Sequence, residues 1–210
     1  MILHGYWRSG AAYRTRIALN LKGVAYEQRG VDLRQGVQRS AAFVALNPQG
    51  MVPALEADGV VLTQSPAILE WLEETVPEPP LLPADPVERA HVRAMAALIG
   101  CDIHPLNNLR VGKALRETFS ADQAAVDAWA GRWITPGFTA LEALVARHGH
   151  GWSFGGVPGL ADCYLVPQIY SDRRFNVPMD AFPRLVAIET AAAAHPAFAA
   201  AHPDRQPDAD

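Results

Sequence analysis

The chain has 210 residues, half of them hydrophobic (50%), and a formal net charge of -4 at pH 7. This size and composition exclude a disordered chain and fit either one compact body or two small domains with a real core. With 18 basic against 22 acidic residues, no broad positive field exists to attract nucleic acid, so any anion site must be local. The N-terminal residues show no signal-peptide pattern and no apolar run is long enough to span a bilayer, so we expect a cytoplasmic protein.

The two cysteines, Cys101 and Cys163, are too few for a disulfide framework. Each stands in an apolar helical pattern, which favours a reduced side chain buried as a small hydrophobe. No group of His, Cys and Asp has metal-ligand spacing, and no glycine-rich phosphate-binding motif occurs. We therefore predict no metal site.

The first 76 residues mix short strands with helices. The predicted elements, in chain order, are a strand at 2–6, a helix from Tyr13 to Leu21 ended by Gly23, a strand at 24–33, a short helix at 40–48, two strands within 53–62 and a helix at 65–76. The two strands meet at Asp58-Gly59, a strong hairpin signal. The order β-α-β-α-β-β-α implies a right-handed crossover between parallel strands, followed by an antiparallel hairpin.

A proline-rich linker follows at residues 77–86, PEPPLLPADP, which no helix or central strand can absorb. Beyond it the chain is alanine-rich with helical patterns and without paired strands, which predicts a helical bundle. We therefore predict two domains, an α/β domain at residues 1–80 and an all-helical domain at 86–210. The residues from Ala200 on hold little apolar surface, and we expect them to lie over the body or to fray.

The segment QGMVPAL (49–55) tests whether the first domain is thioredoxin-like, as its order of elements suggests. A cis bond at Val52-Pro53 costs little and leaves the backbone groups of Val52 facing outward. Those groups can pair with a peptide-like ligand laid antiparallel. An ordinary trans proline is the alternative, but the surrounding order of elements favours the cis form.

The segment QSPAILEWLEE (64–74) carries a helix start signal, with Ser65 predicted as the N-cap and Pro66 as the first helical residue. A plain cap explains these two residues. Gln64 adds an amide beside the helix N-terminus, a combination that also makes a site for a carboxylate.

Five runs carry a resemblance to a known family: WRSGAAYRTRIALNLKGV, ALNPQGMVPAL, QSPAILEWLEE, IHPLNNLR and LADCYLVPQ. Together, from about Ile2 to Pro207, the chain resembles the zeta class of glutathione transferases. The resemblance implies a thioredoxin-like N-terminal domain, a helical-bundle C-terminal domain, glutathione as the cofactor and a homodimer.

The resemblance assigns a chemical role to the turn Arg8-Ser9-Gly10-Ala11, where the class usually reads Arg-Ser-Ser-Cys. Ser9 matches the first serine, which lies nearest the sulfur, and its hydroxyl and the helix N-terminus favour the thiolate form. The second serine and the cysteine are missing, so Ser9 is the only side-chain hydroxyl at this turn. Backbone N–H groups of Gly10 and Ala11 can still donate, and Gly10 allows close approach of the ligand. A plain N-cap role for Ser9 is compatible with this one.

The resemblance also assigns ligand contacts elsewhere in the chain. The residues matched to glutathione contacts are Arg14, Gln38, Val52, Pro53, Gln64 and Ser65, and those matched to the active-site cleft are His104, Asn108 and Arg110. His104 and Asn108 are predicted to share one face of a long helix bent by Pro105, with a solvated polar stripe as the alternative. Arg8 and Arg174 are matched to the substrate carboxylates because the planar guanidinium suits them. Arg173, next to Arg174, is the competing choice.

The implied activity is glutathione-dependent cis-trans isomerisation of maleylacetoacetate, a cis-unsaturated keto diacid. The thiolate adds to the double bond, the resulting single bond rotates, and elimination releases the trans product with glutathione regenerated. Maleylpyruvate is the alternative substrate. A general transferase or dehalogenase that consumes thiol, and a non-catalytic binding module, are the rival functions.

Overall fold

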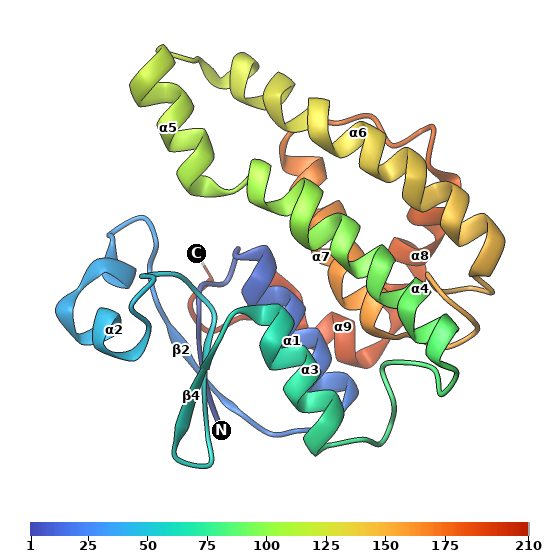
Figure 1. The fold of residues 1–210 in the computed structure, drawn as a ribbon. Helices are drawn as coiled ribbons and strands as arrows, with labels where there is room; N and C mark the ends of the chain where they lie inside the picture. Colours follow the sequence, from blue (N-terminus) through green and yellow to red (C-terminus); the bar gives the residue numbers. More distant parts are fainter. Residues whose placement is uncertain (210) are drawn as a thin grey trace. The chain divides into compact units, whose positions relative to one another are not determined.

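The computed structural model describes residues 1–209, and they form two compact units (Figure 1). The first unit comprises Met1–Leu81 together with the segment from Ala193 onward, and the second comprises Leu82–Ala192. This division differs from the predicted boundary, which assigned everything after residue 86 to the helical domain. The difference arises because helix α9 (Pro196–Ala201) buries Phe198 and Ala201 and packs on helix α1 of the first unit.

The first unit has the thioredoxin-like order of elements predicted from the sequence. Its elements are β1 (Ile2–Gly5), α1 (Gly10–Leu21), β2 (Glu27–Gly30), η1 (Val37–Arg39), α2 (Ala41–Leu46), β3 (Ala54–Ala57), β4 (Val60–Thr63) and α3 (Ser65–Thr75), followed near the C-terminus by α9 and η4 (Pro203–Arg205). The sheet order is β2-β1-β3-β4. Strand β1 pairs parallel with β2 and antiparallel with β3, and β3 pairs antiparallel with β4, so the predicted parallel pair and the predicted hairpin are both confirmed.

The two faces of this sheet follow the alternation of side chains along β1. Leu3 pairs with Leu55 and points to the side of α1, where Gly5 lies in close contact with Ala12. His4 points to the opposite face, where its ring meets Phe43 of α2 edge-on. Figure 1 shows the same layering, with α1 and α3 on one side of the sheet and α2 on the other. Helices α1 and α3 therefore lie on the same face of the sheet.

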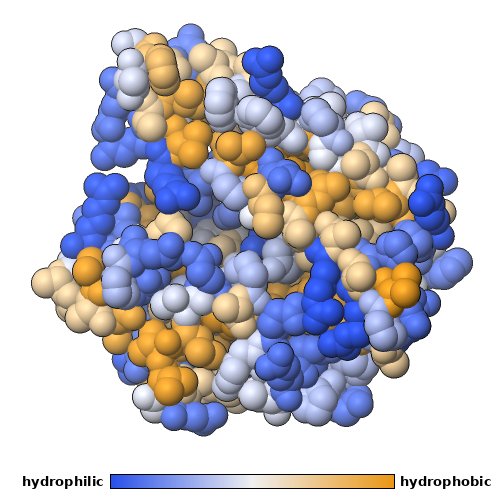
Figure 2. All heavy atoms as spheres, viewed as in Figure 1, coloured by the Kyte–Doolittle hydropathy of each residue, from blue (hydrophilic) through white to orange (hydrophobic). Residues whose placement is uncertain are grey.

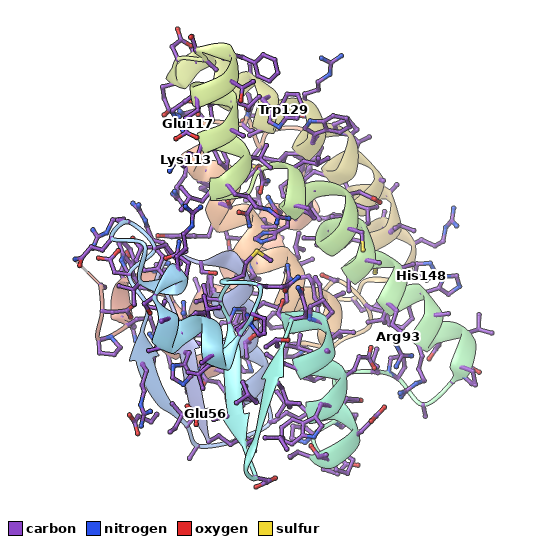
Figure 3. All side chains as sticks on the ribbon, turned by 60° about the vertical axis from the view of Figure 1, so that its left-hand side comes forward. Glu56, Arg93, Lys113, Glu117, Trp129 and His148 are labelled. Carbon is purple, nitrogen blue, oxygen red and sulfur yellow. The ribbon has the colours of Figure 1, made fainter. Side chains whose placement is uncertain are left out.

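The second unit is a helical bundle, as predicted. Its elements are α4 (Pro86–Ala97), the π-helix η2 (Leu98–Ile103), the 3-10 helix η3 (His104–Leu106), α5 (Leu109–Phe119), α6 (Gln123–His148), α7 (Leu160–Arg174) and α8 (Pro183–Ala194), which ends just past the unit boundary. Helix α7 is its core element, because eleven of its residues are buried and it packs on α4. Figure 3 shows Lys113 and Glu117 on α5, where they form an ion pair at 3.4 Å.

The helix predicted to run past residue 104 is broken, so the prediction that His104 and Asn108 share one helix face is wrong. Pro105 has no N–H to donate and its ring clashes with the preceding turn, and the chain passes through η2 and η3 before a new helix begins at Leu109. Asn108 is the N-cap of that helix and accepts from the N–H of Arg110 at 3.2 Å. The residues therefore lie in separate elements.

The cysteine prediction was right for Cys163 and wrong for Cys101. Cys163 is buried, whereas Cys101 is exposed on the π-helix, whose wider turn changes the face that each residue presents. Across residues 1–209, no helix is long and apolar enough to cross a membrane. The same residues contain no cluster of three or more metal-binding side chains.

Candidate functional site

Ser9 is the N-cap of α1, and its geometry leaves the hydroxyl proton available. Its Oγ accepts from the N–H of Ala12 at 3.3 Å, and its own N–H donates to the carbonyl of Tyr6 at 2.9 Å. The cap uses a lone pair of the hydroxyl and not its hydrogen. The N–H groups of Gly10 and Ala11 lie in the first turn, where a helix has no internal partners for them. The turn therefore offers several donors and a positive helix end to an anion.

Arg14 is not a solvated surface residue but a buried one, with 3% of its surface exposed. Its Nη1 donates to Oγ of Ser65 at 3.0 Å, which joins the first turns of α1 to the start of α3. A buried guanidinium adds positive charge to the helix N-terminus that it contacts. Arg14 and Ser65, both matched to glutathione contacts in the sequence, are therefore hydrogen-bonded to each other.

The start of α3 differs from the prediction, because Gln64 and not Ser65 is the N-cap. Ser65 is the first helical residue and Pro66 the second, and the hydroxyl of Ser65 is bound to Arg14 instead of capping the helix. Gln64 has a φ of 67°, a left-handed conformation that costs a side-chain-bearing residue about 1–3 kcal/mol. Such strain is concentrated at ligand sites. The amide of Gln64 donates to Oε1 of Gln49.

The peptide bond between Val52 and Pro53 is cis, as predicted. Strand β3 begins only at Ala54, and within residues 1–209 neither backbone group of Val52 has a hydrogen-bond partner. This arrangement leaves one donor and one acceptor for an extended ligand.

Gln38 lies beside the loop that carries Val52. A Cβ built on Gly50, whose φ is +60°, would meet the carbonyl oxygen of Gln38 at 3.0 Å, so only a glycine lets the two segments approach. The side-chain Oε1 of Gln38 is buried and accepts no hydrogen bond from any residue that the structure describes. Orphaned buried acceptors of this kind are rare and call for an explanation such as a ligand donor.

Arg8 is half-buried and its guanidinium carbon lies 4.9 Å from the centre of the Trp7 ring. Its Nε is buried and has no hydrogen-bond partner among residues 1–209. A cation held on an aromatic face by a cation–π contact keeps its planar donors for another group. Trp7 was missed by the sequence reasoning, although its position next to Arg8 could have pointed to it.

In the first unit, hydrogen bonds and close packing thus bring most of the predicted glutathione residues together. Arg14 joins α1 to Ser65, Gln64 bonds to Gln49, and Gly50 packs on Gln38. Gln49 is a further candidate that the sequence reasoning missed, although it stands in the same loop as Val52.

The remaining candidates lie in the second unit. His104 is in η3, Asn108 caps α5, Arg110 is exposed on α5, and Arg174 is exposed in the last turn of α7. Arg173 forms a two-bond ion pair with Glu189, at 3.0 Å from Nε and 2.5 Å from Nη2.

Two buried aspartates of α7 have raised pKa values for the same physical reason. Burial raises the pKa of Asp162 to about 6, although its carboxylate accepts from the backbone N–H groups of Ser153 and Gly159 at 2.8 and 2.9 Å. Burial raises the pKa of Asp172 to about 8, against the opposing charge of Arg173. Neither oxygen of Asp172, nor the amide of Gln168 one turn earlier, has a partner within residues 1–209.

Comparisons with known proteins agree with this geometry. Residues 8–75 match the family model of the glutathione S-transferase N-terminal domain. The chain is 54% identical to a maleylpyruvate isomerase of Ralstonia sp., over 99% of both chains. It is 52% identical to a maleylacetoacetate isomerase of Pseudomonas aeruginosa, over 99% of this chain and 98% of that one.

One similar solved structure belongs to a named class of glutathione transferases. It is a holo maleylpyruvate isomerase described as a bacterial zeta-class glutathione S-transferase, with a TM-score of 0.98, 53% identity and complete coverage of both chains. The chain belongs to the zeta class of glutathione transferases. Another solved structure, at 47% identity and a TM-score of 0.90, is a maleylacetoacetate isomerase from Anaeromyxobacter dehalogenans with glutathione bound in its active site. The match covers 100% of this chain and 97% of that one.

Proposed function

We propose that this zeta-class chain is a glutathione-dependent cis-trans isomerase that converts maleylacetoacetate to fumarylacetoacetate. The observation that carries the proposal is the Ser9 turn. It presents a donor hydroxyl at the N-terminus of α1, the helix that also carries the buried Arg14, in a chain 52–54% identical to two isomerases over almost its full length.

The first unit contains the groups that glutathione, a tripeptide thiol, requires. Val52 has an unpaired donor and acceptor for the tripeptide backbone, and Gln38 has a buried acceptor without a partner among the described residues. Gln64 and Ser65 at the start of α3, next to Arg14, hold the γ-glutamyl carboxylate. The residues present therefore fit the cofactor.

Bound glutathione supplies a thiolate that adds to the cis double bond, permits rotation, and is released unchanged by elimination. Ser9 donates its hydroxyl hydrogen to the sulfur, and the positive end of α1 lowers the free energy of the charged form. The N–H groups of Gly10 and Ala11 add donors at the same end.

Arg8 and Arg174 bind the two anionic ends of the substrate. Arg8 is suited to this role because the Trp7 ring holds its guanidinium and its Nε has no hydrogen-bond partner among residues 1–209. Arg174 is proposed because it matches the arginine that the family resemblance places near the substrate carboxylates. A guanidinium at the keto end stabilises the charge that grows there in the transition state. His104, Asn108 and Arg110 are proposed as further glutathione-binding residues, on the family resemblance alone.

Maleylpyruvate is the second candidate substrate, because a relative named for it matches this chain as closely as a relative named for maleylacetoacetate. The isomerase named for it has 54% identity to this chain, against 52% for the isomerase named for maleylacetoacetate. The two substrates differ only in the length of the keto acid arm. Steady-state rates on both substrates decide between them.

Proton NMR tests the proposal directly. Purified protein is mixed with each substrate and a small fraction of an equivalent of glutathione, and the cis and trans vinyl signals are followed. We expect complete conversion with the thiol unspent, and a higher kcat/KM for maleylacetoacetate. Thiol loss with a halogenated acid, and no conversion of either maleyl substrate, would show a transferase or dehalogenase instead. Absence of glutathione binding would show a binding module.

We further propose a cytoplasmic homodimer. Support for association comes from the edge strand β4, where Val60 and Val61 are 52% and 38% exposed. Figure 2 shows apolar surface over the part of the first unit that holds this strand. Exposed apolar patches commonly mark an interaction surface. Light scattering of the purified protein checks the dimer.

A further inference from the structure

The C-terminal segment is bonded directly to the backbone of the reactive turn. The carboxylate of Asp208 accepts from the N–H of Trp7 at 2.9 Å and from Nε2 of Gln28 at 2.7 Å. Trp7 immediately precedes Arg8 and Ser9, and Gln28 lies on β2. One side chain near the end of the chain therefore joins the end of β1 to the neighbouring strand.

Strand β2 is shaped to receive this side chain. A Cβ built on Gly30 would lie 3.0 Å from Cβ of Asp208 and 3.4 Å from its carboxylate, closer than ordinary contacts allow. Because Gly30 has no side chain, Asp208 can lie against the strand. Its position is thus fixed by packing as well as by the two hydrogen bonds.

The carbonyl group of Trp7 is held by Arg16. This arginine is fully buried, and its Nη2 donates to the carbonyl of Trp7 at 3.0 Å while its Nε donates to the carbonyl of Ala201 at 2.9 Å. Both backbone polar groups of Trp7 are therefore connected to the C-terminal segment, the N–H through Asp208 and the carbonyl through Arg16.

A displacement of Trp7 would move both reactive side chains. The Trp7 ring lies 4.9 Å from the Arg8 guanidinium carbon, and Ser9 follows two residues after Trp7 in a turn closed by its own N–H and the carbonyl of Tyr6. Catalytic groups must be held to a fraction of an ångström, since a displacement of about 1 Å can cost a hundredfold in rate.

We propose that Asp208 is a positioning residue for the Arg8-Ser9 turn, through its hydrogen bond to Trp7. This inference rests on the proposed isomerase function of that turn. The competing explanation is that Asp208 only fastens the end of the chain and contributes stability alone.

Three variants separate these explanations. Asp208→Ala removes both hydrogen bonds. Asp208→Asn keeps an oxygen for Trp7, and its amide can donate to Oε1 of Gln28, which is buried and has no partner within the described chain. Asp204→Ala is the matched control, because Asp204 stands in the same segment with 69% of its side chain exposed.

Four quantities are measured for each variant: kcat, KM for the keto acid, the melting temperature, and the pKa of the thiol of bound glutathione by ultraviolet absorbance. We expect Asp208→Ala to lower kcat/KM by about ten- to a hundredfold, and to shift the thiol pKa toward that of free glutathione. Asp208→Asn should recover most of both values, and Asp204→Ala should resemble the wild type.

A lower melting temperature for Asp208→Ala, with kcat/KM and thiol pKa equal to those of Asp204→Ala, would overturn the proposal in favour of a simple anchor. The thiol pKa does not depend on turnover. If the wild type lacked isomerase activity but Asp208→Ala still changed the pKa of the bound thiol, the proposed function would fail while the positioning role would stand.

Discussion

Two buried carboxylates, one in each unit, have opposite surroundings. Glu73 of the first unit accepts from Nζ of Lys22 at 2.6 Å and from the N–H of Leu81 at 2.9 Å. Asp172 of the second unit is fully buried, and within residues 1–209 neither of its oxygens has a partner. A buried charge with partners holds elements together, whereas a buried acid without partners is kept neutral at a cost in stability.

In the first unit, charged side chains with partners hold together α1 and α3, the two helices that form the proposed site. Lys22 caps the C-terminal end of α1 and Glu73 lies on α3, so their ion pair joins the far ends of the two helices. The hydrogen bond from Arg14 to Ser65 joins the near ends, where the sulfur and the γ-glutamyl group are proposed to bind. The side-chain carboxyl of Asp172 has no hydrogen-bond partner within the described chain, and Asp172 stands two residues before Arg174.

The largest effect is expected from breaking the partnered pair. Lys22→Met should lower the free energy of unfolding by about 3–5 kcal/mol, because it leaves the buried Glu73 carboxylate without its cation. Denaturant unfolding measures the loss. Lys113→Met is the control, since Lys113 and its partner Glu117 are both more than half exposed and such pairs contribute at most about 1 kcal/mol. Equal losses in the two variants would contradict the role of Lys22.

Ser9→Ala tests the proposed chemistry at the N-terminus of α1. Loss of one donor to the reacting anion should lower kcat by about 10²–10³-fold, with little change in glutathione affinity. Steady-state kinetics with varied glutathione gives both values. Ser40→Ala removes a comparable N-cap, because Ser40 accepts from the N–H of Phe43 at 3.2 Å at the start of α2. It should cost about 1 kcal/mol of stability and leave kcat intact; unchanged turnover in Ser9→Ala would remove Ser9 from the mechanism.

Asp172→Asn tests the acid without partners. Burial raises the pKa of Asp172 from 3.8 to about 8, so the folded state binds this proton more tightly than the unfolded state does. The contribution of the protonated carboxyl to the stability of the folded state is complete below about pH 4. This contribution is lost as the pH rises toward about 8. The amide carries no charge, so this variant should be more stable than the wild type by a few kcal/mol near pH 8, with a smaller gain near pH 5.

Urea unfolding at several pH values provides the measurement. The exposed Asp180→Asn serves as the control. A variant less stable than the wild type at pH 8 would show that the Asp172 carboxylate has a stabilising partner.

The smallest effect separates two neighbouring arginines of α7. Arg174→Gln should raise KM for the keto acid about tenfold, the value of one charge-assisted hydrogen bond. Arg173→Gln breaks the exposed pair with Glu189 and should leave KM unchanged. If the two variants gave the reverse result, Arg173 would be the substrate ligand.

The sequence predicted the first unit well because its signals are local. Asp58-Gly59 specifies a hairpin and Ser9 caps the helix that follows it, each decided by residues that are adjacent in the chain. The cis form of Val52-Pro53 was favoured by the order of the elements around it. The helical class of the second unit was also predictable from composition. The roles of the individual site residues remain predictions.

The errors arise where distant residues compete with local signals. Ser65 has the pattern of an N-cap, but its hydroxyl is taken by Arg14, 51 positions away. The pattern around Pro105 predicted a bend, whereas the chain passes through π and 3-10 turns before a new helix. The packing of residues from Ala193 onward on the first unit depends on contacts such as Asp208 with Trp7, 201 positions apart, which no local pattern encodes.

The most direct test of the central claim, that the Ser9 turn holds a thiolate, is an ultraviolet titration of glutathione bound to the wild type, Ser9→Ala and Ser40→Ala. A free thiol of this kind has a pKa of about 8.5. We expect the pKa of the bound thiol to lie well below that value in the wild type and in Ser40→Ala, and to rise toward it in Ser9→Ala. A bound thiol with the pKa of the free one in the wild type, or the same lowered pKa in all three proteins, would contradict the claim.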